Sequence, residues 1–162
     1  MNDKPRYYIA YGSNLNLEQM AYRCPTAKVV GVSEIKDYQL VFRGNRYSAV
    51  ATIEPKEGAR VPVLIWDIER ADEWALDKYE GFPSFYAKED MNLEIEGTPV
   101  KAMVYIMGDG YEIGIPSQRY FNIIKEGYQS AGFDEMVLNE ALDFSRENMD
   151  KEIMYEGFRL DM

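Results

Sequence analysis

The chain has 162 residues, a length that fits one domain, and 46% of them are apolar, enough to form a hydrophobic core. Its 18 Lys and Arg stand against 28 Asp and Glu, and the formal net charge of −10 disfavours nucleic acid and anionic membranes as partners. The absence of histidine excludes Ser-His-Asp and Cys-His catalysis and imidazole metal sites. Because Cys24 is the single cysteine, no intrachain disulfide can form.

Seven segments have the apolar patterns of strands. In chain order they are residues 6–11, 27–32, 38–42, 47–53, 61–68, 86–96 and 99–107. The fourth is expected to end at Pro55. Met91, Leu93 and Ile95 alternate with polar residues, which favours antiparallel strands with one solvent-exposed face.

Apolar residues at helical spacing predict four helices. They are 17–20 capped by Asn14 or Asn16, 69–79 ending at Gly81, one opening at Pro116-Ser117, and one capped by Asp134. Strands come first and helices mainly late, so we expect a single α+β domain over residues 1–148 instead of alternating βαβ units. Residues 149–162 are expected to form a charged tail that covers the domain or a partner chain.

Two motifs are interpreted as structural. The glycines of residues 108–114 resemble a dinucleotide-binding loop, but Pro116 follows and no βαβ unit surrounds them, so we expect a turn. Four acidic residues could be read as a metal site, but they lack the ligand spacing of one. We expect them to face solvent and to complement the start of the helix over 69–79: Asp67, Glu69, Asp72 and Glu73.

The segment Tyr11-Gly12-Ser13-Asn14 joins a predicted strand to a predicted helix. Such a turn can expose several backbone N–H groups beside a helix start and bind a carboxylate or an oxyanion. The alternative is that Gly12 and Asn14 only form the turn and cap the helix. Spacing alone leaves both interpretations open.

Glu80 is in an unfavourable place for a carboxylate. It lies at the carboxyl end of a predicted helix, where the helix dipole disfavours an anion. Apolar bulk from its aromatic neighbours, Tyr79, Phe82, Phe85 and Tyr86, would also desolvate it. Both effects raise the pKa of a carboxyl group, as a general acid/base near neutral pH requires. The alternative is a solvated carboxylate at a frayed helix end.

Three landmarks in this order resemble the γ-glutamylcyclotransferase-like family. The stretch from Tyr8 to Leu15 resembles its YGSNL signature. The residues from Leu76 to Gly81, followed by aromatic residues and Tyr86, look like its Glu-Gly segment. Pro116-Ser117-x-x-Tyr120 resembles a helix opening late in the same domain.

The resemblance implies an α+β fold with a mixed, mostly antiparallel, barrel-like sheet and flanking helices. It also implies release of 5-oxoproline from γ-glutamyl compounds, with Glu80 as the acid/base. The substrate-binding residues that it implies are Tyr8, Ile9, Ala10, Tyr11, Gly12, Ser13, Asn14, Tyr86 and Tyr105. No metal or cofactor is expected, because the substrate's own amine is the nucleophile.

Other functions remain open. The enzyme could act on a γ-glutamyl-amine or on a γ-glutamylated biosynthetic intermediate, or the chain could be a non-catalytic member that binds a small ligand. We expect a small-molecule γ-glutamyl substrate as partner, with a homodimer left open, and neither nucleic acid nor membrane. Because residues 1–5 contain no apolar segment and no apolar run approaches 18 residues, the expected location is the cytoplasm.

Overall fold

A computed structural model describes residues 5–160, with side chains as far as Met149. One sheet has the strand order β2-β3-β1-β5-β4. The strands are β1 (Arg6–Ala10), β2 (Lys28–Asn45), β3 (Ser48–Ile68), β4 (Tyr86–Ile95) and β5 (Thr98–Met107). β1 and β5 pair in parallel, whereas the other three strand pairs are antiparallel. The predicted α+β fold with a mostly antiparallel sheet is confirmed.

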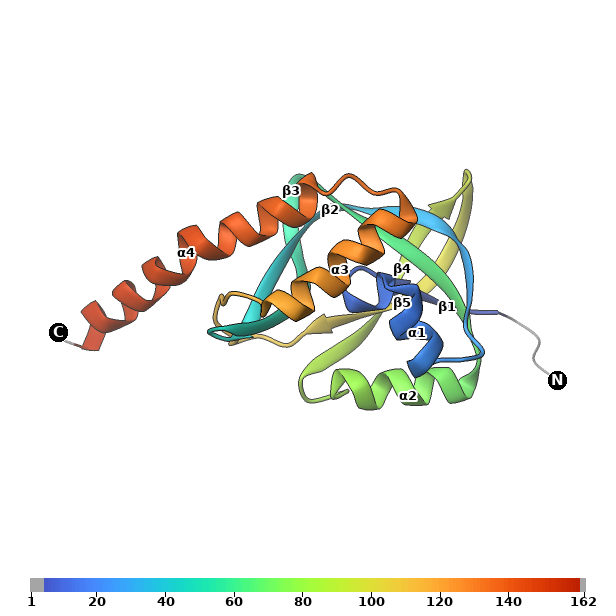
Figure 1. Cartoon of the computed structure of the whole chain (residues 1–162), viewed down its shortest axis with the longest axis horizontal. Coiled ribbons are helices and arrows are strands. Elements are labelled where there is room, and N and C mark those ends of the chain that lie inside the picture. The colour runs from blue at the N-terminus through green and yellow to red at the C-terminus, as the bar shows by residue number, and fades with distance from the viewer. Residues whose placement is uncertain (1–4, 161–162) are drawn as a thin grey trace.

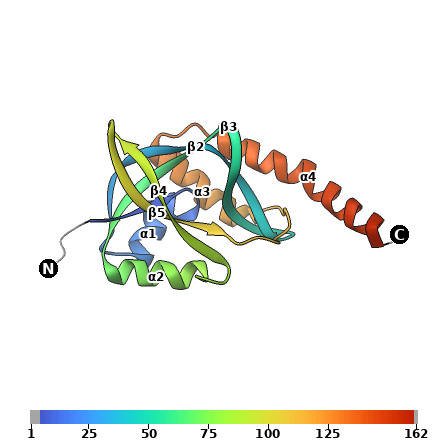
Figure 2. The same ribbon diagram turned by 180° about the vertical axis from the view of Figure 1, so that it is seen from behind.

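The sheet is barrel-like but not closed (Figures 1 and 2). No ladder joins the edge strands β2 and β4 in the described part of the chain. They meet through a side chain, since the Ser33 hydroxyl donates to the carbonyl of Glu94 (2.6 Å). A Cβ at Gly31 would lie 2.9 Å from Ile95 Cγ2, so glycine allows this close approach.

β2 and β3 are longer than the sequence pattern predicts. Pro55 does not end β3. β1 pairs only with Leu64–Ile68 of β3, so at Pro55 the strand is paired to β2 on one side and to no strand on the other. A missing N–H is tolerated at such an edge. β2 bends at a register shift beside Asp37, whose φ is 62°. Each strand joins two predicted ones: 27–32 with 38–42, and 47–53 with 61–68.

The helical elements of residues 5–160 are η1 (Ser13–Leu15), α1 (Leu17–Arg23), α2 (Arg70–Glu80), α3 (Gln118–Ala131) and α4 (Met136–Leu160). Polar side chains cap them near the predicted positions. Asn16 accepts from the N–H of Gln19 (3.1 Å), and Ser117 accepts from that of Tyr120 (3.2 Å). Gly81 ends α2 in the left-handed conformation (φ 65°).

The helices lie on different sides of the sheet. α1 and α3 lie on one side, whereas α2 runs along one end (Figures 1 and 2). α4 packs against β2 and then extends away from the sheet, so the residues expected to form a tail after Asn148 continue a helix as far as Leu160. None of the described helices has the length and apolar character of a membrane span.

Asp72 and Cys24 are both buried. The prediction that Asp72 faces solvent is wrong. Its carboxylate accepts a hydrogen bond from the N–H of Glu69 (3.0 Å), as part of a capping box, and a second one from the Thr26 hydroxyl. Cys24 follows α1, and burial raises the pKa of its thiol to about 11. The thiol is therefore protonated at neutral pH and weakly nucleophilic.

Candidate active site

A cavity of about 200 Å³ opens among β1, η1, the end of α2 and the start of α3. Its volume is below the range of about 300–1,000 Å³ typical of pockets for drug-sized ligands, so it suits a ligand of amino-acid size. The lining residues are Tyr8, Ile9, Tyr11, Gly12, Ser13, Asn14, Val50, Ala51, Tyr79, Glu80, Phe85, Tyr86, Tyr105 and Tyr120.

The structure brings all the predicted site residues except one to this cavity. Ala10 is buried, pairs with Leu64 in the sheet, and does not line the cavity. The sequence-based prediction missed Val50, Ala51 and Tyr120 as lining residues. The helix-opening motif that contains Tyr120 was a usable signal, whereas the two β3 residues reach the cavity only through strand register.

Close packing fixes the loop from Gly12 to Leu15 against its neighbours. A Cβ at Gly12 would lie 3.2 Å from Ala51 Cβ, and one at Gly127 would lie 2.6 Å from Leu15 Cβ. Glycine thus lets β3 and α3 approach the loop. The N–H groups of Ser13 and Asn14 donate no hydrogen bond to the described backbone and side-chain groups, so they can serve an anionic ligand.

Glu80 contributes a carboxyl group to the cavity wall. The residue is half-buried and shares the cavity wall with Tyr79, Phe85 and Tyr86, three of the aromatic residues expected around it. Burial raises the pKa of its carboxyl group to about 7, and the positive charge of Arg23 partly opposes this shift. No group of the described residues hydrogen-bonds it. Such a carboxyl can take up and return a proton near neutral pH.

Tyrosines form much of the polar wall. The Tyr11 hydroxyl donates to the carbonyl of Tyr105 (2.6 Å), and the Tyr86 hydroxyl donates to that of Ala51 (2.6 Å). The N–H of Ala51 donates to the Tyr120 hydroxyl (3.0 Å). The phenol groups of Tyr11, Tyr86, Tyr105 and Tyr120 all have raised pKa values, and burial is the largest cause in each case. They remain protonated and uncharged at neutral pH.

A second polar cluster links α1 to the cavity. The Asn14 side-chain amide donates to the Tyr8 hydroxyl (2.9 Å), and Arg23 donates to the oxygen of the same amide. The guanidinium of Arg23 stacks 3.5 Å above the ring of Tyr79. Because the Tyr79 hydroxyl and Ser13 Oγ are 3.0 Å apart, this cluster fixes α1, α2 and the loop together.

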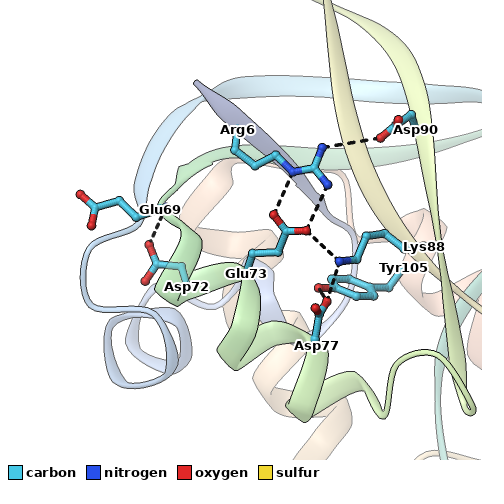
Figure 3. A network of polar contacts seen from close by, with 8 residues as sticks. All are labelled: Arg6, Glu69, Asp72, Glu73, Asp77, Lys88, Asp90 and Tyr105. Carbon is cyan, nitrogen blue, oxygen red and sulfur yellow. Dashed lines mark hydrogen bonds and ion pairs between the residues drawn. The ribbon is translucent and has the colours of Figure 1, made fainter. Parts of the chain in front are cut away.

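An ion-pair network holds Tyr105 from outside the cavity (Figure 3). The Tyr105 hydroxyl donates to Asp77, and Lys88 Nζ lies 2.8 Å from Asp77 and 2.7 Å from Glu73. Arg6 Nε lies 2.9 Å from Glu73, and this hydrogen bond is the main cause that lowers the Glu73 pKa to about 2. The described residues contain no group of three or more His, Cys, Asp or Glu placed to hold a metal ion.

Known proteins match this chain over most of its length. The family model for gamma-glutamyl cyclotransferase, AIG2-like, matches residues 8–126. The chain is 30% identical over 134 residues to gamma-glutamylcyclotransferases of Homo sapiens and Bos taurus, covering 77% of this chain and 71% of each relative. A solved structure of a gamma-glutamyl cyclotransferase is similar, with a TM-score of 0.74, 27% identity, and coverage of 89% of this chain and 86% of that one.

The fold, the cavity that Glu80 lines and these matches define an enzyme of the cyclotransferase type. The chain belongs to the gamma-glutamyl cyclotransferase, AIG2-like family. The family resemblance and the enzyme class predicted from the sequence are therefore confirmed.

Proposed function

We propose that this chain converts the γ-glutamyl group of a small compound into 5-oxoproline and releases the attached amine or amino acid, with Glu80 as general acid/base. The observation that carries the proposal is the Glu80 carboxyl group, which lies in the cavity with a pKa of about 7 and without a hydrogen-bond partner among the described side chains and backbone groups. The relatives' name, gamma-glutamylcyclotransferase, supports the substrate class.

The proposed reaction is an intramolecular acyl transfer. The Glu80 carboxylate takes a proton from the substrate's α-ammonium, and the freed amine attacks the γ-carbonyl carbon to close a five-membered ring. When the tetrahedral intermediate collapses, the bond to the leaving nitrogen breaks and Glu80 returns a proton to that nitrogen. Glu80 carries a second proton in the same way, from the attacking nitrogen after ring closure to the released amine. Overall the attacking nitrogen loses two protons and the leaving nitrogen gains two, so Glu80 ends as a carboxylate. Proximity within the substrate supplies much of the rate.

The cavity wall offers the remaining interactions that this reaction needs. In the proposal the N–H groups of Ser13 and Asn14 donate to the anionic oxygens of substrate and intermediate. The predicted substrate-binding residues that line the cavity surround the γ-glutamyl group in this proposal: Tyr8, Ile9, Tyr11, Gly12, Ser13, Asn14, Tyr86 and Tyr105. Ala10 contributes by holding β1 in the sheet and makes no contact with the substrate.

The function is tested by incubating the protein with γ-glutamyl-alanine, glutathione and γ-glutamyl-lysine side by side and measuring 5-oxoproline. Formation of 5-oxoproline from at least one compound is expected, and the preferred one identifies the leaving group. A preference for γ-glutamyl-lysine would favour a γ-glutamyl-amine substrate. Binding without 5-oxoproline from any compound would contradict the proposal and favour a non-catalytic binding protein.

A further inference from the structure

The hydroxyl groups in the cavity differ in what they can offer a ligand. Tyr11, Tyr86 and Tyr105 donate their protons to acceptors of the protein. The Tyr8 hydroxyl instead accepts a hydrogen bond from the Asn14 side chain (2.9 Å), as the Tyr120 hydroxyl does from the N–H of Ala51 (3.0 Å). Among the side chains and backbone groups that the structure describes, the proton of the Tyr8 hydroxyl has no acceptor. Tyr8 can therefore donate to a ligand in the cavity.

Arg23, from outside the cavity, sets the direction of the hydrogen bond between Asn14 and Tyr8. An asparagine side chain can present either its oxygen or its NH₂ group to a neighbour, but a guanidinium group has only donors. Because Arg23 donates to Asn14 Oδ1, the NH₂ group of Asn14 must point to Tyr8. Trp66 Nε1 also donates to the backbone carbonyl of Asn14 (3.1 Å), which holds that residue in place.

We propose that Arg23 is a positioning residue that acts through Asn14 to make the Tyr8 hydroxyl a hydrogen-bond donor to the α-carboxylate of the substrate. This inference rests on the proposed function. Arg23 itself does not line the cavity, so it acts on the ligand through its neighbours.

The position of Tyr8 relative to Glu80 favours the α-carboxylate as its partner. In the proposed reaction the α-ammonium lies against Glu80, and the α-carboxylate is attached to the same carbon atom. That carboxylate must therefore lie close to the Glu80 carboxylate and needs donors that offset the repulsion between them. Tyr8 and Glu80 line the same cavity, so the Tyr8 hydroxyl is a donor available to a carboxylate bound beside Glu80.

A pair of probes isolates this interaction. L-glutamine carries the α-carboxylate, whereas 4-aminobutanamide lacks it and keeps the amine and the γ-amide. Binding of each is measured by NMR titration in the full chain carrying Glu80→Gln, which slows turnover by about 10²–10⁴-fold. Tyr8→Phe is expected to weaken glutamine binding about 10- to 100-fold, the range for a hydrogen bond to a charged group, and to change 4-aminobutanamide binding less than about twofold.

Arg23→Ala is expected to weaken glutamine binding about 3- to 10-fold, since water can then reorient the Asn14 amide. In a protein that already carries Tyr8→Phe, Arg23→Ala should weaken glutamine binding by less than about another twofold, because Arg23 acts through Tyr8. Arg23→Lys keeps a charged donor and should recover part of the loss. It also replaces Arg23→Ala if that variant does not fold.

Matched controls are Tyr128→Phe, which removes a buried hydroxyl without a partner in the described residues, and Arg60→Ala, which breaks an exposed pair with Glu34. Neither should change the ratio of the two affinities. The inference would be overturned if Tyr8→Phe weakened the binding of both probes equally. It would also be overturned if the effects of Arg23→Ala and Tyr8→Phe on glutamine affinity multiplied in the double variant. If the parent protein binds neither probe and no γ-glutamyl compound is cyclised, the proposed function itself fails.

Discussion

Helix α2 carries two glutamates whose surroundings are opposite. Glu73, in the first turn, is hydrogen-bonded to Arg6 and Lys88, which hold the pKa of its carboxyl group at about 2 (Figure 3). Glu80, the last residue, has no such partner in the described part of the chain, and burial raises its pKa to about 7. The same helix thus holds one carboxylate that is stabilised as an anion and one that is destabilised.

The helix itself contributes to this difference. The amino end of a helix favours an anion and the carboxyl end disfavours one, each by about 0.3–1 kcal/mol. Cations from β1 and β4 stabilise the Glu73 carboxylate further. The Glu80 carboxylate is destabilised further, because it is half-buried in the cavity wall. A carboxylate kept at a cost to stability is typical of a residue retained for chemistry.

The largest expected effect is the loss of activity in Glu80→Gln. The substitution keeps the volume of the side chain and removes its ability to exchange a proton. General acid–base transfer contributes about 10²–10⁴-fold, so 5-oxoproline release should fall by that factor. Affinity for a γ-glutamyl ligand, measured by titration, should change little, because the loop amides that hold its carboxylate are intact. Turnover at the wild-type rate would remove Glu80 from the mechanism.

The pH dependence of activity should report the pKa of Glu80. The carboxylate form accepts the proton, and kcat/KM follows the ionisation of the free enzyme. With a pKa of about 7, kcat/KM should fall about tenfold for each pH unit below 7, or about 100-fold at pH 5. Measurements from pH 5 to 8 at constant ionic strength test this. A profile flat down to pH 5 would show that Glu80 titrates with an ordinary pKa.

Glu73→Gln should weaken the fold and leave the chemistry intact. The folded-state pKa of Glu73 is below the ordinary 4.5, so its contribution is present above pH 4.5 and is lost as the pH falls toward 2. After a discount for partial exposure, the variant should lose about 1–3 kcal/mol of unfolding free energy at pH 7, and the difference should vanish near pH 2. Urea denaturation at both pH values measures this.

Activity provides the other half of that test. At pH 7, kcat/KM of Glu73→Gln should stay within about threefold of wild type, since Glu73 does not line the cavity. Glu34→Gln is a matched control, because the pair of Glu34 with Arg60 is exposed and worth about 0–1 kcal/mol. A loss of activity as large as that of Glu80→Gln would contradict the separation of roles along α2.

Local sequence patterns predicted the two parts of the site that each lie within one segment. Gly12, Ser13 and Asn14 follow a strand and precede a helix, and Glu80 precedes a glycine that ends one. Both signals depend on helix ends, whose chemistry is set by neighbouring residues along the chain. The cause predicted for the raised pKa of Glu80, desolvation by its surroundings, is also the largest cause in the structure.

Contacts between distant segments were not predictable in this way. Ala51 reaches the cavity through the register of a strand that was expected to end at Pro55. Arg23 becomes relevant only because α1 packs beside α2 and brings it above the ring of Tyr79. No spacing rule along one chain encodes such a contact, since the two residues are separated by two strands and most of a helix.

The smallest expected effect is a gain of stability in Glu80→Gln. The folded-state pKa of Glu80 is above the ordinary 4.5, so its ionisation costs stability as the pH rises from 4.5 through 7. Glutamine has no charge to desolvate. Because Glu80 is half-buried and can relax toward water, the gain at pH 8 should be about 0.5–2 kcal/mol, and it should disappear at pH 4, where the wild-type carboxyl is protonated. Urea denaturation at pH 4 and pH 8 measures this difference. A loss of stability at pH 8, like that expected for Glu73→Gln at pH 7, would mean that Glu80 is also a paired, structural carboxylate and would remove the contrast between the two ends of α2.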